Sequence, residues 1–317
     1  MSNGYGMGGH LGFCFQQSFD TAYNTGQKFF PLITESLTES IPPLVQAGMT
    51  GTYHEGQSFE GPHDIAGDAV CDAHPSLIGY LLKGVCGQSS STVVTSYYYS
   101  HIFQPRLADF DDFSALPPAT IEVYRDAGSA FQYYNCNVNK LQIEWAYGQL
   151  VKSTASLIGG KFATAAKATA TYEPFSEWTW DQTSVSLAGT GIDEIESLTM
   201  AITANVAAKG TLNSSKYPNR IKRTAPYSIE ISGTILFTSQ TEVDNFRNQT
   251  QQILIITTKQ NSHQLQVSIP SFRYSTFPVN IGGTGQIGVG FTGSAKYNAG
   301  SGHAIKFTLL VTSQSTY

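Results

Sequence analysis

The sequence is poor in charge, since Asp, Glu, Lys and Arg make up only 13% of its 317 residues. No apolar stretch approaches the roughly 18 residues that a membrane-spanning helix needs. The N-terminus is rich in glycine and lacks a basic region followed by an apolar run. Neither a signal peptide nor a membrane span is therefore predicted.

Cysteine is also scarce. Cys14, Cys71, Cys86 and Cys136 lie far apart, and no two of them form a Cys-x-x-Cys pair. This spacing predicts reduced, partly buried thiols of a cytoplasmic protein, although the sequence leaves a disulfide open.

Signatures of catalysis are missing as well. The sequence has no Gly-x-Ser-x-Gly element and no Gly-Lys-Ser/Thr phosphate loop. Glycines at 283, 285 and 288 have the spacing of a dinucleotide loop, but a strand-like segment follows them, so no helix dipole is available. Segment 63–74 contains His, Asp and Cys, yet its spacing matches no zinc or calcium pattern. We predict no enzyme, no cofactor and no metal, with a polar loop at 63–74 and a sheet turn at the glycines.

Glycine (30 residues), tyrosine (17) and phenylalanine (18) are abundant beside many serines and threonines, which favours strands and turns. Segments 120–124 and 140–145 alternate apolar with polar residues, as in a sheet with one packed face and one wet face. Further strands are expected at 178–187, 198–206, 285–297 and 304–312. The predicted class is mainly β.

The chain repeats an order of elements. A Ser-x-Glu strand at 57–61, a short helix at 75–84 and strands at 120–124 and 131–135 are followed by a similar series at 227–233, 241–250, 253–257 and 264–269. The offset is 170 between Glu60 and Glu230 but 133 between Ile121 and Leu254. We predict two units, 1–165 and 166–317, joined near 163–174, and the duplication points towards assembly.

Two segments of the first unit have no expected core. Residues 1–50 look like an irregular, extended arm, and residues 86–119 form a long insertion in which aromatic residues alternate with acids. We expect the insertion to be a flap that becomes ordered only on another subunit.

Charge is distributed unevenly, since residues 1–165 carry 14 acids and 7 bases whereas 209–223 carries five bases and no acid. Nucleic-acid binding with Tyr217 stacked on a base is one reading of the basic stretch, but the acidic net charge of −5 favours a contact between subunits. We expect the bases to meet Asp64, Asp68, Asp72, Asp109, Asp111 or Asp112 of a neighbouring chain. The predicted contact residues are Tyr97, Tyr98, Tyr99, Phe103, Phe110, Asp111, Asp112, Phe113, Lys209, Lys216, Arg220, Lys222 and Arg223.

Similarity to a known family lies in several segments: residues 12–26, 33–37, the Ser-x-Glu-Gly element with the helix that follows Pro75, and 228–233 with the helix at 241–247. Together they resemble the tail tube proteins of long-tailed bacteriophages. The resemblance implies two tandem tail-tube-like β-sandwich or barrel units, each with a short flanking helix. Three copies would then close a ring with sixfold appearance, and stacked rings would form a channel that DNA crosses without specific binding.

The resemblance further implies a place in the virion tail, assembly in the host cytoplasm, and tape-measure, tail tip and terminator proteins as partners. Two other readings stay open at this point. One is a tail tip or adaptor protein with the same fold. The other is a carbohydrate-binding β-protein or an enzyme, in which tyrosines and tryptophans would stack on sugar rings.

Overall fold

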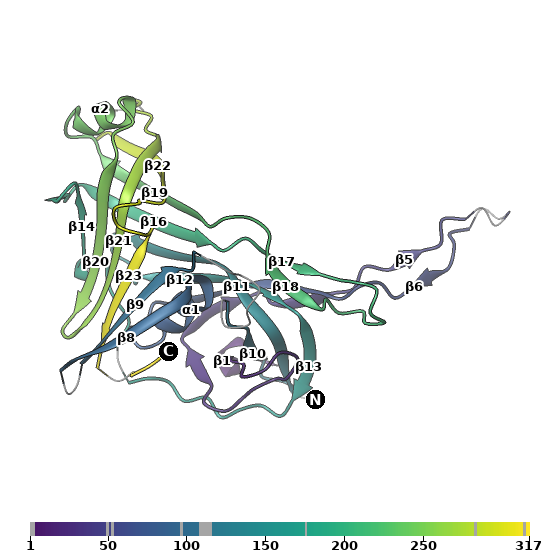
Figure 1. The fold of residues 1–317 in the computed structure, drawn as a ribbon. Coiled ribbons are helices and arrows are strands. Elements are labelled where there is room, and N and C mark those ends of the chain that lie inside the picture. The colour runs from purple at the N-terminus through teal and green to yellow at the C-terminus, as the bar shows by residue number, and fades with distance from the viewer. Residues whose placement is uncertain are drawn as a thin grey trace.

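The computed structural model describes residues 4–48, 51, 54–95, 98–107, 116–174, 176–281, 284–312 and 315–317. Antiparallel strands make up most of it, and the described residues contain two short α-helices (Figure 1). The predicted mainly β class is confirmed, including a short helix in each half.

The first half supplies a 3-10 turn, thirteen strands and one helix in the order of the chain. They are η1 (Gly6–Gly8), β1 (His10–Phe15), β2 (Lys28–Phe30), β3 (Leu32–Glu35), β4 (Thr38–Ser40), β5 (Leu44–Val45), β6 (Ser58–Phe59), β7 (Asp64–Asp72), α1 (Ile78–Cys86), β8 (Gly87–Thr95), β9 (Tyr98–Pro105), β10 (Ala119–Tyr124), β11 (Ala130–Ala146), β12 (Lys152–Gly159) and β13 (Lys161–Ala165).

The second half follows the same order without the hairpin β8–β9. Its elements are η2 (Trp180–Gln182), β14 (Thr183–Leu187), β15 (Thr190–Gly191), β16 (Ile195–Thr203), β17 (Val206–Lys209), β18 (Arg220–Arg223), β19 (Ser228–Leu236), α2 (Thr241–Arg247), β20 (Gln252–Gln260), β21 (His263–Thr276), β22 (Gly288–Ala295) and β23 (Lys306–Val311).

The internal repeat is visible in how the strands pair. The first-half pairs β1–β10, β1–β2, β5–β6, β7–β12, β10–β11, β11–β12 and β11–β13 have the counterparts β14–β20, β14–β15, β17–β18, β19–β22, β20–β21, β21–β22 and β21–β23. Strands β3 and β4 together pair with β7 as β16 pairs with β19. The two halves therefore share one topology.

β-Bulges fix which residues correspond. The β10–β11 register shifts between Ala119 and Ile121, and the β20–β21 register shifts between Gln252 and Leu254. Ile121 thus corresponds to Leu254, at the expected offset of 133. The expected match of Glu60 with Glu230 is wrong: Glu60 follows the hairpin β5–β6, whereas Glu230 lies within β19, the counterpart of β7.

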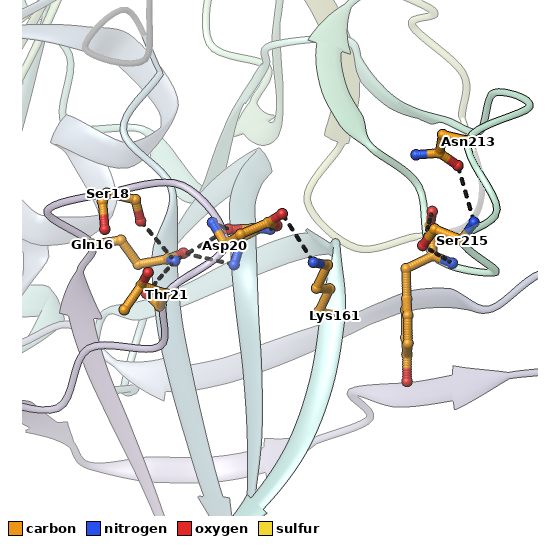
Figure 2. A network of polar contacts seen from close by, with 9 residues as sticks. Gln16, Ser18, Asp20, Thr21, Lys161, Asn213 and Ser215 are labelled. Atoms are coloured by element: carbon orange, nitrogen blue, oxygen red, sulfur yellow. Dashed lines mark hydrogen bonds and ion pairs between the residues drawn. The ribbon is translucent and has the colours of Figure 1, made fainter.

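Strand β11 belongs to two sheets, because its N-terminal part pairs with β10 and β13 and its C-terminal part with β12 and β16. The chain changes direction near the buried Asn135, whose φ is +55°. Its amide donates to Asp20 Oδ1 (2.6 Å), its backbone N–H donates to Gln16 Oε1 (2.6 Å), and Asp20 pairs with Lys161 (2.9 Å) (Figure 2). This network attaches the segment after β1 to the bend in β11.

The expected arm at 1–50 is wrong for its first part. β1 is a core strand between β2 and β10, and Leu11, Phe13 and Phe30 are buried. The hairpin β5–β6 does project from the body, with Leu44 and Phe59 each 57% exposed (Figure 1). Within the expected arm, the described part that projects is thus the strand β5 with its partner β6, and the hairpin β17–β18 projects beside them (Figure 1).

Helix α1 ends later than the sequence predicts. Gly84 lies within the helix, where an added Cβ would come 2.7 Å from Val138 Cγ2, so this glycine allows close packing on β11. The helix stops at Gly87, whose left-handed φ of +74° lets its N–H return to the Lys83 carbonyl.

The insertion at 86–119 is mostly ordered within the chain, contrary to the expected flap. Residues 87–95 and 98–105 form the paired strands β8 and β9, and β9 also pairs with β23 of the second half. Residues 108–115 lie outside the described part. Because β11 also pairs with β16, both halves share a continuous sheet, and the division at 165/166 stays a prediction.

The four cysteines are buried free thiols, as expected. Burial raises the pKa of Cys14 to about 11 and that of Cys71 to about 12. Thiols held in this protonated form are poor nucleophiles.

Candidate functional site: a polar sheet face and two hairpins

Six strands stand side by side across the centre of the molecule in the order β7–β12–β11–β16–β19–β22. Along each of them, buried residues alternate with exposed or half-buried ones. The registers place the exposed and half-buried residues directly opposite one another; one such row consists of Asp72, Lys152, Glu144, Thr199, Ser232 and Thr292. We call this surface the polar face.

The polar face is built mainly from small and hydroxyl-bearing side chains. Serine or threonine occupies many of its positions, namely Thr154, Ser156, Ser197, Thr199, Thr203, Ser228, Ser232, Thr234, Thr292 and Ser294. Among the described residues of these six strands, no aromatic residue occupies a position on the polar face. Such a surface offers few apolar contacts to a molecule that passes along it.

Acids outnumber bases on the polar face. Its charged residues on the paired strands are Asp64, Asp68, Asp72, Lys140, Glu144, Lys152 and Glu230. The register sets Lys152 between Asp72 and Glu144, so this base is flanked by acids on both sides. Partial burial, and after it the nearby Glu177, raises the pKa of Asp72, while Lys152 acts in the opposite direction. The surface thus carries a negative excess, which repels phosphate.

The opposite side of the same strands is the core. Leu141, Ile143, Met200, Ile202 and Ile231 are fully buried there. Trp145 belongs to this side and donates its indole N–H to Thr258 Oγ1 on β20 (2.9 Å). One contiguous core therefore fixes the shape of the polar face across both halves.

The basic stretch lies in the hairpin β17–β18, and part of it binds its own chain. Lys216 pairs with Glu60, and the Lys216 carbonyl accepts the His63 N–H (3.0 Å). Arg223 lies over the Tyr227 ring, 3.6 Å from its centroid. Lys209 and Arg220 are exposed, and Lys222 is half-buried. The expected acidic partners Asp64, Asp68 and Asp72 instead occupy the polar face.

The expected aromatic contacts divide into three groups. Tyr98 and Tyr99 are half-buried on β9, and the Tyr98 hydroxyl contacts Ser262. The expected contact of Phe103 with another subunit is corrected, because Phe103 has no exposed surface and lies opposite Phe307 in the core of its own chain. Tyr97, Phe110, Asp111, Asp112 and Phe113, together with Asp109, lie outside the described residues.

Segment 63–74 is strand β7 with its flanks, so the expected polar loop is wrong. His63 receives two carboxylates, Glu39 Oε1 at 2.7 Å and Glu60 Oε1 at 2.8 Å, and the bond to Glu39 is the main cause that raises its pKa. His74 Nδ1 accepts the Ser76 N–H. Within the described ranges, no three His, Cys, Asp or Glu side chains are grouped as metal ligands.

The carbohydrate-binding hypothesis needs exposed tryptophans that could stack on sugar rings. Trp145 and Trp178 are core residues at 5% and 0% exposure, and Trp180 lies beside Tyr147 with 4.3 Å between ring centroids. Near the glycine motif, β22 begins at Gly288, so the strand that the sequence predicts after it is present.

The polar face as a unit is not predictable from the sequence. Its signal was the alternation at 140–145, which indicated a wet face but not which strands would extend it. Six-strand continuity depends on pairings between residues far apart in the chain, such as Glu144 with Thr199.

Comparison with known proteins identifies the family. No described helix is long and apolar enough to cross a membrane. A search of curated proteins gives no match. The family model described as "Phage tail tube protein" matches residues 6–295, which is nearly the whole chain. The chain therefore belongs to the phage tail tube proteins, which are structural proteins of the virion tail.

Proposed function

We propose that this chain polymerises into stacked rings that form the tail tube, with the polar face lining a channel for DNA. The observation that carries the proposal is the continuous polar face shared by two repeats of one topology. A channel lining should not hold phosphate, because each cation facing DNA adds attraction that slows passage. Small hydroxyl side chains and excess acid meet this requirement.

Three copies per ring follow from the duplication. Each chain contributes two units of equal topology, so a ring of three has sixfold appearance and threefold symmetry. The projecting hairpin β5–β6 can contact other copies, because its apolar residues are exposed and do not pack in the core of their own chain. Tape-measure, tail tip and terminator proteins are the expected further partners, and assembly is expected in the host cytoplasm.

The exposed residues of the predicted contact set keep their place in this proposal. Lys209 and Arg220 on β17–β18 are exposed, and Tyr98 and Tyr99 on β9 are half-buried, so these described members can contribute surface to a contact with another copy. Exposed ion pairs contribute only about 0–1 kcal/mol each, so they would select orientation more than hold the ring together.

Electron microscopy of the purified chain tests assembly. Tubes of stacked three-copy rings with the polar face inside are expected, whereas a tip or adaptor protein would form a single ring. A chain that stays monomeric and binds sugars would support the carbohydrate reading instead.

A charge variant tests the channel. Thr199→Lys with Ser232→Lys places two cations on neighbouring strands of the polar face. Virions that carry it are expected to assemble and to eject DNA more slowly, whereas Thr190→Lys on the exposed strand β15 should eject normally. Unchanged ejection by the double variant would contradict a channel lined by this face.

A further inference from the structure

The two repeats use their sheet edges unequally. The C-terminal part of β11 is paired on both sides, by β12 and by β16. Its counterpart in β21 pairs with β22 over Phe272–Thr276. On the other side β20 reaches Phe272, and no described strand pairs with Arg273–Thr276 there. After Thr276 the chain runs to residue 281 without pairing.

Bulges align this unpaired segment with β11 residue by residue. The β11–β12 register shifts between Val138 and Lys140, and the β21–β22 register shifts between Tyr274 and Thr276. Lys140 thus corresponds to Thr276.

The correspondence continues beyond the end of β21. Leu141, Ile143 and Trp145 correspond to Phe277, Val279 and Ile281, so the apolar residues recur at the same positions. Trp145 is 5% exposed, whereas Ile281 is 82% exposed. Residues 276–281 therefore have the pattern of a strand that lacks a partner.

The missing partner has a counterpart within the chain. The β16–β19 register shifts between Ile195 and Ser197, and the β3–β7 register shifts between Leu32 and Thr34, so β3 and β4 correspond to β16. Strand β16 is paired on both sides, by β19 and β11. In the described part of the chain, β3 and β4 pair with β7 alone.

We propose that residues 276–281 of one copy pair antiparallel with residues 35–40 of a second copy, repeating between chains the β11–β16 contact made within the chain. The register carries over from Lys140 opposite Thr203, which places Thr276 opposite Ser40, Pro278 opposite Thr38 and Asn280 opposite Ser36. This interface rests on the proposed function. The contact is head-to-tail, which is the type of contact that can repeat from copy to copy around a ring.

Pro278 has no N–H to donate, but the direction of the backbone groups shows that the proposed pairing does not need one at this position. The Ser36 N–H donates to the Asp68 carbonyl (2.9 Å), so Ser36 is turned towards β7. Backbone groups alternate sides along a strand, and Glu35, Leu37 and Glu39 therefore face the open edge. Their partners in the second copy are residues 281, 279 and 277, none of which is proline. Pro278 faces β22 instead, where its missing N–H accounts for the end of β21–β22 pairing.

The open edge is protected in the single chain. The Leu37 N–H donates to Glu35 Oε2 (3.0 Å), and the Leu37 carbonyl accepts from Arg125 Nη2 (2.9 Å) and from the Tyr133 hydroxyl (3.0 Å). Charged side chains at an edge strand oppose unwanted pairing. On ring formation, backbone hydrogen bonds to residues 276–281 of the second copy would replace these side-chain hydrogen bonds of Leu37.

Cross-linking tests the register. Thr276→Cys with Ser40→Cys joins two exposed positions that form a non-hydrogen-bonded pair, with Cα atoms about 4.5 Å apart, within disulfide range. The native cysteines are buried, so they should add little background. Oxidation of assembled protein should give a covalent ladder that ends at the ring size. The control Thr276→Cys with Ser36→Cys is about 13 Å out of register and should give no ladder.

Proline substitution tests the hydrogen bonds. Val279→Pro removes an N–H that faces the second copy, and at least a tenfold loss of assembled protein is expected. Asn280→Pro removes one that faces β22, and normal assembly is expected. Both positions are unpaired in the single chain, so folding should be unchanged.

The outcomes separate the interface from the function. Rings or tubes that give no ladder with the matched pair, or equal effects of the two prolines, would overturn this interface and leave the proposed function standing. Wild-type protein that forms neither rings nor tubes would overturn both.

Discussion

Replacing Phe103 by alanine should strongly destabilise the single chain. Phe103 has no exposed surface, lies opposite Phe307 and makes an edge contact with Tyr317, with 5.7 Å between ring centroids. Truncation of such a phenylalanine costs about 3–5 kcal/mol, because apolar burial is lost and a cavity is left. At about 1.4 kcal/mol per tenfold change, the unfolded fraction should rise by about a hundredfold or more.

Urea unfolding of the unassembled chain measures this loss, with the buried Trp145 and Trp178 as fluorescent reporters. Phe59→Ala is the matched control, because Phe59 is 57% exposed on the projecting hairpin and should change stability by no more than about 0.5 kcal/mol. If Phe103 were a contact between subunits, its truncation would weaken assembly and leave the single chain intact. A loss below about 1 kcal/mol would therefore refute the assignment of Phe103 to the core.

Two further predictions concern the single chain. Gly87→Ala should cost about 1–2 kcal/mol, since alanine is strained at a φ of +74°, whereas Gly191→Ala, which has open space and no positive φ, should be near neutral; equal effects in thermal unfolding would contradict this. The raised pKa of His63, caused mainly by Glu39, means that its stabilising contribution is complete below about pH 6.5 and declines as pH rises through the raised value. Unfolding between pH 6 and 9 should show this decline in the wild type and a flatter profile in His63→Gln; identical profiles would exclude the His63 pair as its source.

Alternation of apolar and polar residues predicted the strands that have one wet face. The expected strands at 120–124, 140–145 and 253–257 lie within β10, β11 and β20. Segments 131–135 and 140–145 were predicted as separate strands because the bulge after Val138 and the left-handed Asn135 interrupt the alternation of β11.

Strands buried on both sides were harder to predict. Five of the six residues of β1 are buried, so its sequence shows no alternation and was read as part of an arm. The hairpin β8–β9 has exposed residues along most of β8, because among its two described strands it is β9 that pairs with the body, through β23. Long-range pairing of this kind leaves no local pattern in the sequence.

Within the repeat, the match of residues that rests on the order of strands is correct, and the match that rests on a short motif is wrong. Ile121 and Leu254 occupy the same place beside equivalent bulges. Glu60 and Glu230 share only a Ser-x-Glu motif, and Glu60 contacts His63 and Lys216 at the base of the hairpins. A three-residue match specifies no pairing partner, whereas a bulge shared by two strand pairs constrains both.

Fusion of two units in one chain changes how a ring of this kind closes. The β11–β16 contact forms within the chain, where the linker keeps both strands at a high effective concentration. In the proposed ring only residues 276–281 and 35–40 remain to meet between copies, so half of the edge contacts are already made before two chains collide. The hairpin β8–β9 occurs in the first repeat alone and covers the edge of β23, which makes the two units unequal. That inequality removes strict sixfold symmetry. In the proposed ring, residues 276–281 and 35–40 give each chain one donor edge and one acceptor edge, the condition for head-to-tail closure.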